Sequence, residues 1–158
     1  MAKIELVPMT SEQFGAWLPG TIAGYAAEHV RTGRWSEEEA LERSREEHHR
    51  LLPDGLATPD HHLWNVVPAG GGEAVGMVWF QALHKPAPSA FIYNIEIYPQ
   101  FRRRGYAEQA MLELEKEARR LGLESIRLHV FGHNTAARPL YEKLGYVPTN
   151  IDMLKRLT

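Results

Sequence analysis

The segment from Ile95 to Ala107 combines residue types that bind a phosphate group. A strand-like run ends at Pro99, three arginines follow at positions 102–104, and Gly105 begins an apolar helical pattern. Free amide hydrogens at a helix N-terminus and the positive end of the helix dipole attract anions. A glycine lets the backbone approach a phosphate closely. The segment predicts a pyrophosphate site, and the alternative is a solvated arginine loop with a glycine that eases a turn.

A second group of residues with chemical potential lies about thirty residues later. Asn134 is a favourable capping residue for a helix predicted over 135–144, and Tyr141 follows seven positions on, about two helical turns. We therefore expect Tyr141 on the same side of the helix as the cap, with its hydroxyl directed toward the strand ends. Pro139 is tolerable only near the first turn. The alternative is that Asn134 is only a cap and Tyr141 a core aromatic.

The two segments together resemble the GCN5-related N-acetyltransferase (GNAT) superfamily. The first matches the family signature Arg/Gln-x-x-Gly-x-Gly/Ala, and Ile97-Tyr98-Pro99 resembles its Val-x-Pro strand end. The second resembles Asn…Ala-x-x-x-Tyr-x-Lys-x-Gly-Tyr/Phe. The resemblance extends from Lys3 to Leu157, and the matching positions are Arg102, Gly105, Ala107, Asn134, Tyr141, Gly145 and Tyr146.

The resemblance implies acetyl-CoA as cosubstrate, CoA as product, and no metal. Backbone amides from Arg103 to Ala107 would hold the pyrophosphate, and main-chain atoms of Ile95 to Ile97 would pair with pantetheine and polarise the acetyl carbonyl. Asn134 would contact the pantetheine arm, and the Tyr141 hydroxyl would protonate the departing thiolate. The implied cofactor-binding residues are Ile95, Ile97, Arg102, Arg103, Arg104, Gly105, Tyr106, Ala107 and Asn134.

The base that deprotonates the acceptor is a choice between two side chains. Glu96 stands in an apolar run, where a carboxylate is costly to bury unless it is paired or useful. Asn94 lies on the same strand face by alternation and would orient Glu96 or the substrate. His129 is the rival, at the position of a glutamate base in some relatives. We rank Glu96 first, and a water relay that ends at either residue is the remaining option.

The predicted reaction is direct attack by a primary amine on the thioester in a ternary complex. We expect a small molecule or a single amino group as acceptor, and Trp17, Tyr25, Trp35 and Trp64 are either walls of its site or core residues. A CoA-binding regulatory or sensor domain without turnover is the alternative function. A monomer and a homodimer are both compatible with the sequence.

Composition limits the other classes of function. The chain of 158 residues is 44% hydrophobic and 24% charged, has no cysteine and has a net charge of −2. These values exclude disulfides and thiolate zinc sites and argue against nucleic acid as the main partner. The N-terminal sequence lacks a signal peptide and no run is long enough to span a membrane, so we expect a cytoplasmic protein. Adjacent histidines at 48–49 and 61–62 are poor chelates, and we expect them at the surface.

The elements that must position these residues follow from hydrophobic periodicity and turn signals. One domain over residues 1–158 is predicted, of the α/β (α+β) class, with a mixed, mostly antiparallel sheet flanked by helices. The element order is β-α-α-β-β-β-α-β-α-β. Capping boxes at Thr10/Gln13 and Ser36/Glu39 begin helices, with separate helical stretches near 10–18 and 22–30. The predicted strands are 3–7, 62–67, 74–83, 90–98, 125–131 and 146–157, and a long helix runs from Gly105 to Leu121.

Overall fold

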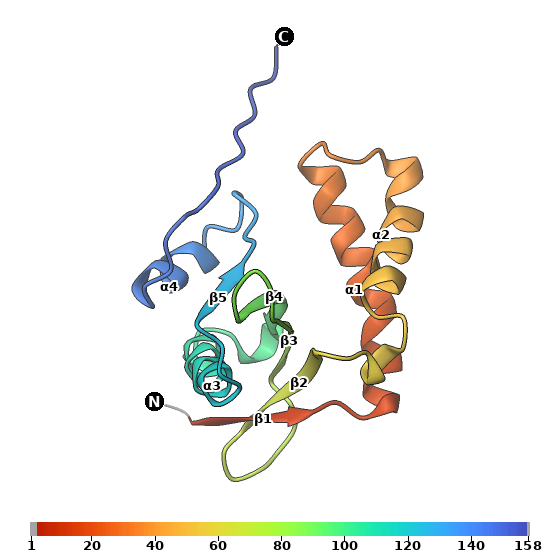
Figure 1. Cartoon of the computed structure of the whole chain (residues 1–158). Helices are drawn as coiled ribbons and strands as arrows, with labels where there is room; N and C mark the ends of the chain where they lie inside the picture. The colour runs from red at the N-terminus through yellow and green to blue at the C-terminus, as the bar shows by residue number, and fades with distance from the viewer. Residues whose placement is uncertain (1–2, 158) are drawn as a thin grey trace. The chain divides into compact units, whose positions relative to one another are not determined.

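Five strands form one mixed sheet in the first of two units, which extends to Leu128 (Figure 1). The computed structural model describes residues 3–157. The strands lie side by side in chain order: β1 (Ile4–Pro8), β2 (His61–Pro68), β3 (Gly76–Leu83), β4 (Ser89–Ile97) and β5 (Ser125–Leu128). The first four pair antiparallel, and β5 pairs parallel to β4. This agrees with the predicted fold class, including the antiparallel majority.

Helix α3 (Tyr106–Arg120) connects the two parallel strands and covers one face of the sheet. A parallel pair needs such a crossover, because the chain must return to the end of the sheet at which the first strand began before it can run in the same direction again. A short 3-10 turn, η2 (Pro99–Phe101), leads from β4 toward α3. The helix buries the apolar stripe that the sequence predicts, with three- and four-residue spacing. Its buried residues are Ala110, Met111, Leu114 and Ala118.

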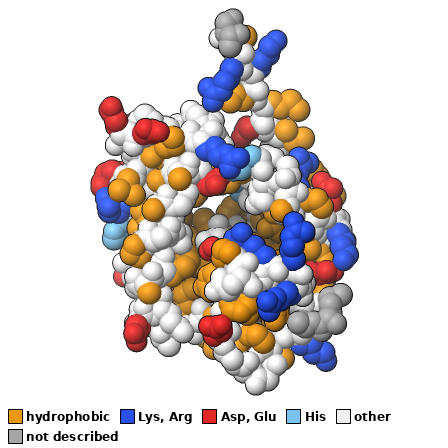
Figure 2. Space-filling model, turned by 180° about the vertical axis from the view of Figure 1, so that it is seen from behind, with side chains coloured by type: hydrophobic (Ala, Val, Ile, Leu, Met, Phe, Trp, Pro, Cys, Tyr) orange, Lys and Arg blue, Asp and Glu red, His pale blue; other side chains and the backbone are white. Residues whose placement is uncertain are grey.

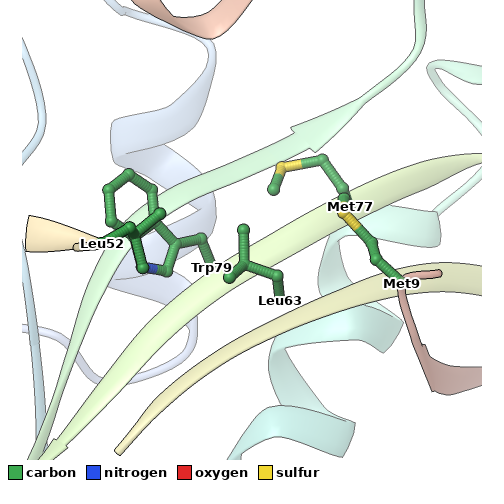
Figure 3. Close-up of a cluster of buried hydrophobic side chains, with 5 residues drawn as sticks. All are labelled: Met9, Leu52, Leu63, Met77 and Trp79. Atoms are coloured by element: carbon green, nitrogen blue, oxygen red, sulfur yellow. The ribbon is translucent and has the colours of Figure 1, made fainter. Parts of the chain in front are cut away.

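Helices α1 (Ser11–Arg31) and α2 (Glu37–Leu51) cover the other face of the sheet (Figure 1). Both predicted capping boxes are formed, and each joins the capping side chain and the third helical residue reciprocally. The 3-10 turn η1 (Gly55–Ala57) links α2 to β2. A buried cluster joins these helices to the sheet (Figure 3), and it consists of Met9, Leu52, Leu63, Met77 and Trp79.

The prediction of two separate helical stretches before residue 31 was wrong, because α1 is continuous through Pro19. Proline removes the hydrogen bond to the carbonyl four residues earlier, which belongs to Gly15. Both residues are exposed, so water can donate to the Gly15 carbonyl oxygen instead. The apolar contacts of Ile22 and Ala26, both buried, hold the later turns in line with the earlier ones.

Two of the four adjacent histidines are buried, which corrects the prediction that all four lie at the surface. His48 is 5% exposed, and its Nδ1 lies 2.8 Å from the Ser44 carbonyl oxygen. His61 is 8% exposed, and its Nδ1 accepts a hydrogen bond of 3.0 Å from Trp79 Nε1. Each imidazole ring has a hydrogen-bond partner, so His48 and His61 can be buried without an unsatisfied Nδ1 atom.

The second unit begins at His129 and contains one helix, α4 (Ala137–Lys143). The strand predicted over 146–157 is not formed: residues 147–157 have no regular structure and are all exposed. A strand is held by hydrogen bonds to a neighbouring strand, and Pro148 also lacks the amide hydrogen that such a ladder needs. The single domain over 1–158 stays a prediction.

Candidate active site

The start of α3 presents free backbone donors to solvent. Gly105 is the N-cap residue, with a left-handed φ of 82°, and no side chain caps this helix end. The first amides of the helix have no carbonyl four residues earlier within the helix to bond, so they remain available to an anion. Residues 102–105 are exposed, and Arg103 also has a left-handed φ of 64°. The predicted phosphate-binding segment thus has the backbone geometry that an anion site requires.

The three arginines of this loop differ in their surroundings. Arg102 Nε donates a 2.8 Å hydrogen bond to the carbonyl oxygen of Ile97, which ties the loop to the end of β4. The Arg104 guanidinium carbon lies 5.8 Å from the centre of the Phe101 ring, a cation–π distance. The Arg102 side chain therefore holds the loop against the end of β4, whereas the left-handed backbone of Arg103 turns the chain.

One edge of β4 is open over its last five residues. β5 pairs with β4 only from Ser89 to Ile92, so no strand in residues 3–128 covers that edge beyond Ile92. The Tyr98 amide donates to the Val75 carbonyl oxygen at 2.8 Å. Because backbone groups of an antiparallel strand point alternately to its two neighbours, Ile95 and Ile97 direct their amide and carbonyl groups to the open edge. These are the two residues predicted to bind pantetheine.

A β-bulge sets the direction of the Glu96 side chain. The register of β3 with β4 shifts between Trp79 and Phe80, so Trp79 pairs with Asn94 and Met77 pairs with Glu96. Side chains of paired residues share a face of the sheet, so Asn94 and Glu96 lie on the face covered by α1 and α2. The predicted alternation of the two residues agrees with this placement, whereas the bulge was not predicted.

Glu96 is half-buried and has no cationic partner within residues 3–157. No side-chain hydrogen bond of Glu96 is formed there either, and this disfavours the alternative that it pairs with an arginine. Burial, with a contribution from the Glu96 charge, raises the pKa of Tyr98, which lies two residues further along the chain, just after β4. The Glu96 carboxylate is thus available for a substrate.

Gly76 is a residue of this site that sequence analysis missed. An added Cβ would lie 2.1 Å from the Glu96 carbonyl oxygen and 2.9 Å from Ile97 Cδ1, so only glycine permits the observed approach of β3 to β4. The available signal was a glycine within a strand pattern, which often marks a close backbone approach.

In the second unit, Asn134 does not occupy the N-cap position. The N-cap of α4 is Ala136, and Asn134 lies two residues before it. Its Oδ1 still accepts a hydrogen bond of 3.3 Å from the Ala137 amide, so it satisfies one free donor of the helix. The prediction that Asn134 is the N-cap of a helix over 135–144 was therefore wrong, because the helix begins at Ala137. The placement of Asn134 and Tyr141 on one side stays a prediction. Pro139 lies in the first turn of α4, as predicted.

Tyr141 is half-buried, and burial raises the pKa of its hydroxyl above 10.0. Its ring centre lies 6.0 Å from that of Tyr146. The rival base, His129, is exposed, follows directly after β5 and contacts the Phe131 ring at a centroid distance of 4.9 Å. A raised pKa keeps the Tyr141 phenol protonated, which is the form that a general acid needs. The catalytic roles of Tyr141 and His129 stay predictions.

The aromatic residues considered for the acceptor site belong mainly to the core. Trp35 and Trp64 are each 8% exposed. Trp17 is half-buried against Trp79 at a centroid distance of 5.8 Å, and the Tyr25 hydroxyl donates to Glu47 Oε1 at 3.4 Å. A hollow of about 220 Å³ lies beside α1 and the end of α2. The residues that line it are Phe14, Leu18, Ile22, His48, His49, Leu52, Pro53 and Gly55.

Comparison with known proteins decides the family. The model of the acetyltransferase (GNAT) family matches residues 27–146, about three quarters of the chain. The chain belongs to the GNAT family. The resemblance predicted from the two motifs is therefore confirmed.

Close relatives of this GNAT protein come from Bacillus subtilis (strain 168). The uncharacterized N-acetyltransferase YycN is 41% identical over 155 residues, which cover 98% of this chain and 99% of the relative. The uncharacterized N-acetyltransferase YdgE is 40% identical over 154 residues, which cover 96% of this chain and 97% of the relative. The crystal structure of YycN has a TM-score of 0.93 and covers 99% of both chains. The protein is an N-acetyltransferase by family and by these relatives.

More distant solved structures share the GNAT fold. The aminoglycoside N-acetyltransferase AAC(6')-Iy, solved in complex with CoA, is 17% identical with a TM-score of 0.62, over 99% of this chain and 96% of that one. In the part of this chain that the structure describes, no three His, Asp or Glu side chains are grouped to hold a metal ion. No helix of residues 3–157 is long and apolar enough to cross a bilayer.

Proposed function

We propose that this GNAT protein transfers the acetyl group of acetyl-CoA to a primary amine, with both substrates bound together. The observation that carries the proposal is the open edge of β4 beside the uncapped start of α3, joined by the Arg102–Ile97 hydrogen bond. An extended arm that bears amides and a pyrophosphate fits this pair of features. A solved relative of the same fold, AAC(6')-Iy, binds CoA.

The pyrophosphate binds the free amides from Arg103 to Ala107. Gly105 has no side chain there, and an added Cβ would meet nothing within 4 Å, so the approach to this helix end is open. Arg103 and Arg104 are exposed beside it and supply positive charge. The pantetheine arm pairs with the outward amide and carbonyl groups of Ile95 and with the outward amide of Ile97, as an added strand would, while the Ile97 carbonyl oxygen accepts from Arg102.

The chemical step forms a bond between the amine nitrogen and the acetyl carbonyl carbon and breaks the carbon–sulfur bond. Outward backbone amides of β4 stabilise the negative charge on the carbonyl oxygen. Glu96 removes a proton from the incoming ammonium group, so that the attacking amine is neutral. Tyr141 gives its proton to the departing thiolate of CoA. Asn134 holds the pantetheine arm.

The acceptor is a small molecule or a single amino group. The half-buried carboxylate of Glu96, which has no cationic partner in residues 3–157, attracts an ammonium group to the face covered by α1 and α2. A CoA sensor without turnover is not favoured, because the two relatives at 40% identity or above are named N-acetyltransferases.

The first experiment measures the thermal unfolding midpoint with CoA, acetyl-CoA, pantetheine, ATP and NAD. A ligand at about a hundred times its dissociation constant stabilises the folded state by roughly 2.7 kcal/mol. We expect a clear shift with CoA and acetyl-CoA and a much smaller one with pantetheine, which lacks the pyrophosphate. The absence of a shift at millimolar CoA would contradict the proposal. Release of CoA with panels of amines then follows by thiol detection, without background because the chain has no cysteine.

Two glycines at opposite ends of α3 give a matched pair of variants. Gly105 has φ 82° and Gly122 has φ 78°, and an added Cβ at either meets nothing within 4 Å. Gly105→Ala and Gly122→Ala therefore introduce the same left-handed strain, of about 1–2 kcal/mol. Only Gly105→Ala should weaken CoA binding. Equal CoA affinity in both variants would remove the start of α3 from the site.

A further inference from the structure

Three polar side chains at the end of β4 have no hydrogen-bond partner among residues 3–157. They are Asn94, Glu96 and Tyr98, and all three are half-buried. The hydroxyl of Tyr93, on the same strand, does have a partner, because it donates to Gln81 Oε1 at 2.9 Å. A polar group that is removed from water without a hydrogen bond costs free energy. Three such groups in succession therefore indicate a site for a polar ligand.

Tyr98 continues the alternation of β4 by one residue. Its backbone is extended, with φ −63° and ψ 145°, and its amide donates to the Val75 carbonyl oxygen at 2.8 Å. Because successive residues of an extended chain point to opposite faces, Tyr98 lies on the same face as Glu96. Burial and then the Glu96 charge raise the pKa of Tyr98, as expected for neighbours. With about 6.6 Å between residues two apart, the row from Asn94 to Tyr98 is about 13 Å long.

The row lies between a buried apolar surface and the open edge of β4. On the β3 side, Met77 pairs with Glu96 and Trp79 pairs with Asn94, and these two apolar residues are 0% and 2% exposed. On the other side, β5 pairs with β4 only as far as Ile92, so no strand of residues 3–128 covers the row there. The row is thus next to the backbone groups to which we assign the thioester.

Helix α2 brings two further charged residues close to β4, and these are paired with each other. Burial raises the pKa of Tyr93, while Arg50 lowers it and Glu47 raises it. Arg50 Nη2 lies 3.7 Å from Glu47 Oε1, which also accepts from the Tyr25 hydroxyl at 3.4 Å. Glu96 has no cationic partner in residues 3–157, and the amide and phenol beside it are uncharged groups that both donate and accept. The row therefore presents one negative charge between two neutral hydrogen-bonding groups.

We propose that Asn94, Glu96 and Tyr98 recognise the acceptor together, and that the acceptor carries one ammonium group between uncharged hydroxyl or amide groups. This inference rests on the proposed acetyl transfer and narrows its acceptor. Glu96 binds the ammonium group, while Asn94 and Tyr98 form hydrogen bonds to the neutral groups on either side. A second ammonium group finds no second carboxylate in the row, so diamines are poor acceptors.

Two primary amines with the same carbon skeleton test the row. Serinol has a hydroxyl group on each side of its amine carbon, whereas isopropylamine has none. The parent should use serinol with a kcat/KM about tenfold higher or more, because a site that hydrogen-bonds a substrate hydroxyl discriminates against the analogue without it. Asn94→Leu and Tyr98→Phe should each reduce this ratio by about 3- to 10-fold, the loss expected for one hydrogen bond. The ratio cancels any general effect of a substitution on turnover.

Tyr93→Phe is the matched control, because the Tyr93 hydroxyl lies on the same strand and is already bonded to Gln81. This variant should keep the parent's ratio. Equal use of the two amines by the parent would overturn the proposal, as would a ratio that neither Asn94→Leu nor Tyr98→Phe reduces. An equal reduction in Tyr93→Phe would overturn it too.

The thermal unfolding midpoint gives a second readout, which needs no turnover. With CoA present, serinol should raise the midpoint further, whereas isopropylamine and the diamine putrescine at the same concentration should have much smaller effects. A larger shift with putrescine would overturn the single ammonium group. A serinol shift without release of CoA from acetyl-CoA would contradict acetyl transfer and support the row. Release of CoA with equal kcat/KM for serinol and isopropylamine would support the transfer and overturn the row.

Discussion

At the scale of single residues, Glu96 differs from the other carboxylates of the sheet and helices. Glu39, Glu42 and Glu113 form ion pairs with neighbours on their own helices and face solvent. Glu96 stands on a strand, is half-buried, and has no cationic partner in residues 3–157. A carboxylate is costly to bury without a partner, so a catalytic or binding role explains its presence better than stability does.

We predict that Glu96→Gln lowers kcat by about 10²–10⁴-fold, because the amide cannot accept the ammonium proton. The size of the side chain is nearly conserved, so CoA should still raise the unfolding midpoint as it does in the parent. Glu113→Gln is the matched control, since Glu113 is paired with Lys116 at 2.7 Å on α3. If both variants turn over like the parent, His129 or a water relay becomes the base.

Tyr141→Phe should lower kcat by about 10²-fold while CoA affinity barely changes, because the phenol is proposed to act only on the leaving thiolate. Burial raises the pKa of Tyr141 above 10.0, so deprotonation of this group should not reduce the parent's kcat below that pH. Steady-state rates from about pH 6 to 10 and CoA titrations check both statements. An unchanged kcat in the variant would remove Tyr141 from the mechanism.

The helix start of the proposed phosphate site was predictable at residue level, because a helix end depends on residues close in sequence. Gly105 is at the start of α3, and Ile95 and Ile97 direct their backbone groups to an open edge. The close approach of Gly76 to Glu96 was not predictable, since it joins two strands through a register that a bulge shifts. Nothing local in the sequence fixes such a register.

At the scale of elements, the contact between β3 and β4 positions the strand that carries Glu96. Gly76→Ala would place a methyl group 2.1 Å from the Glu96 carbonyl oxygen, which is backbone and cannot rotate away. We expect the strands to separate locally, with a loss of roughly 1–3 kcal/mol of stability and a strong decrease in turnover. Thermal unfolding and the thiol-release assay measure the two effects.

Gly24→Ala is the matched control for this change. Gly24 lies inside α1, has no unusual φ, and an added Cβ meets nothing within 4 Å. Alanine should raise stability there by about 0.5–1 kcal/mol, because it favours the helix. A parent-like Gly76→Ala variant, beside a stabilised Gly24→Ala variant, would show that the close approach is not needed.

Element prediction succeeded where the signal was local. The capping boxes at Thr10 and Ser36 begin helices as predicted, since each depends on residues three apart. The prediction failed at Pro19, where packing of the later turns outweighs the lost hydrogen bond, and over 146–157, where a strand pattern finds no neighbour in the described structure. A strand depends on its partner, which the sequence of the segment alone does not provide.

At the scale of the whole molecule, charge and burial act on different parts of the protein. Acidic and basic side chains are interspersed over the face shown in Figure 2, as expected for a chain with a net charge of −2. The interior instead contains titratable rings, among them His61, whose pKa is lowered below 6.5, first by burial and then by His62. Burial also lowers the pKa of His62.

The imidazoles of the buried His61 and the half-buried His62 predict that the protein loses stability as the pH falls below 6.5. The unfolded chain takes up protons on His61 and His62 near that pH, while the folded chain keeps both rings neutral until their lower pKa values are reached. Since the unfolded state then binds more protons, the free energy of unfolding falls with decreasing pH. Protonation of His61 at Nδ1 would also remove the acceptor for Trp79 Nε1.

The variant His61→Asn isolates one part of this effect, because an amide oxygen can accept the Trp79 hydrogen bond and does not titrate. Its unfolding midpoint should fall less than the parent's between about pH 7.5 and 5, whereas at the upper end of this range the two proteins should be similar. His49→Asn is the control, since His49 is exposed, and it should follow the parent throughout. If all three proteins lose stability in parallel, the acid sensitivity arises from His62 or from carboxylates and not from the imidazole that Trp79 contacts.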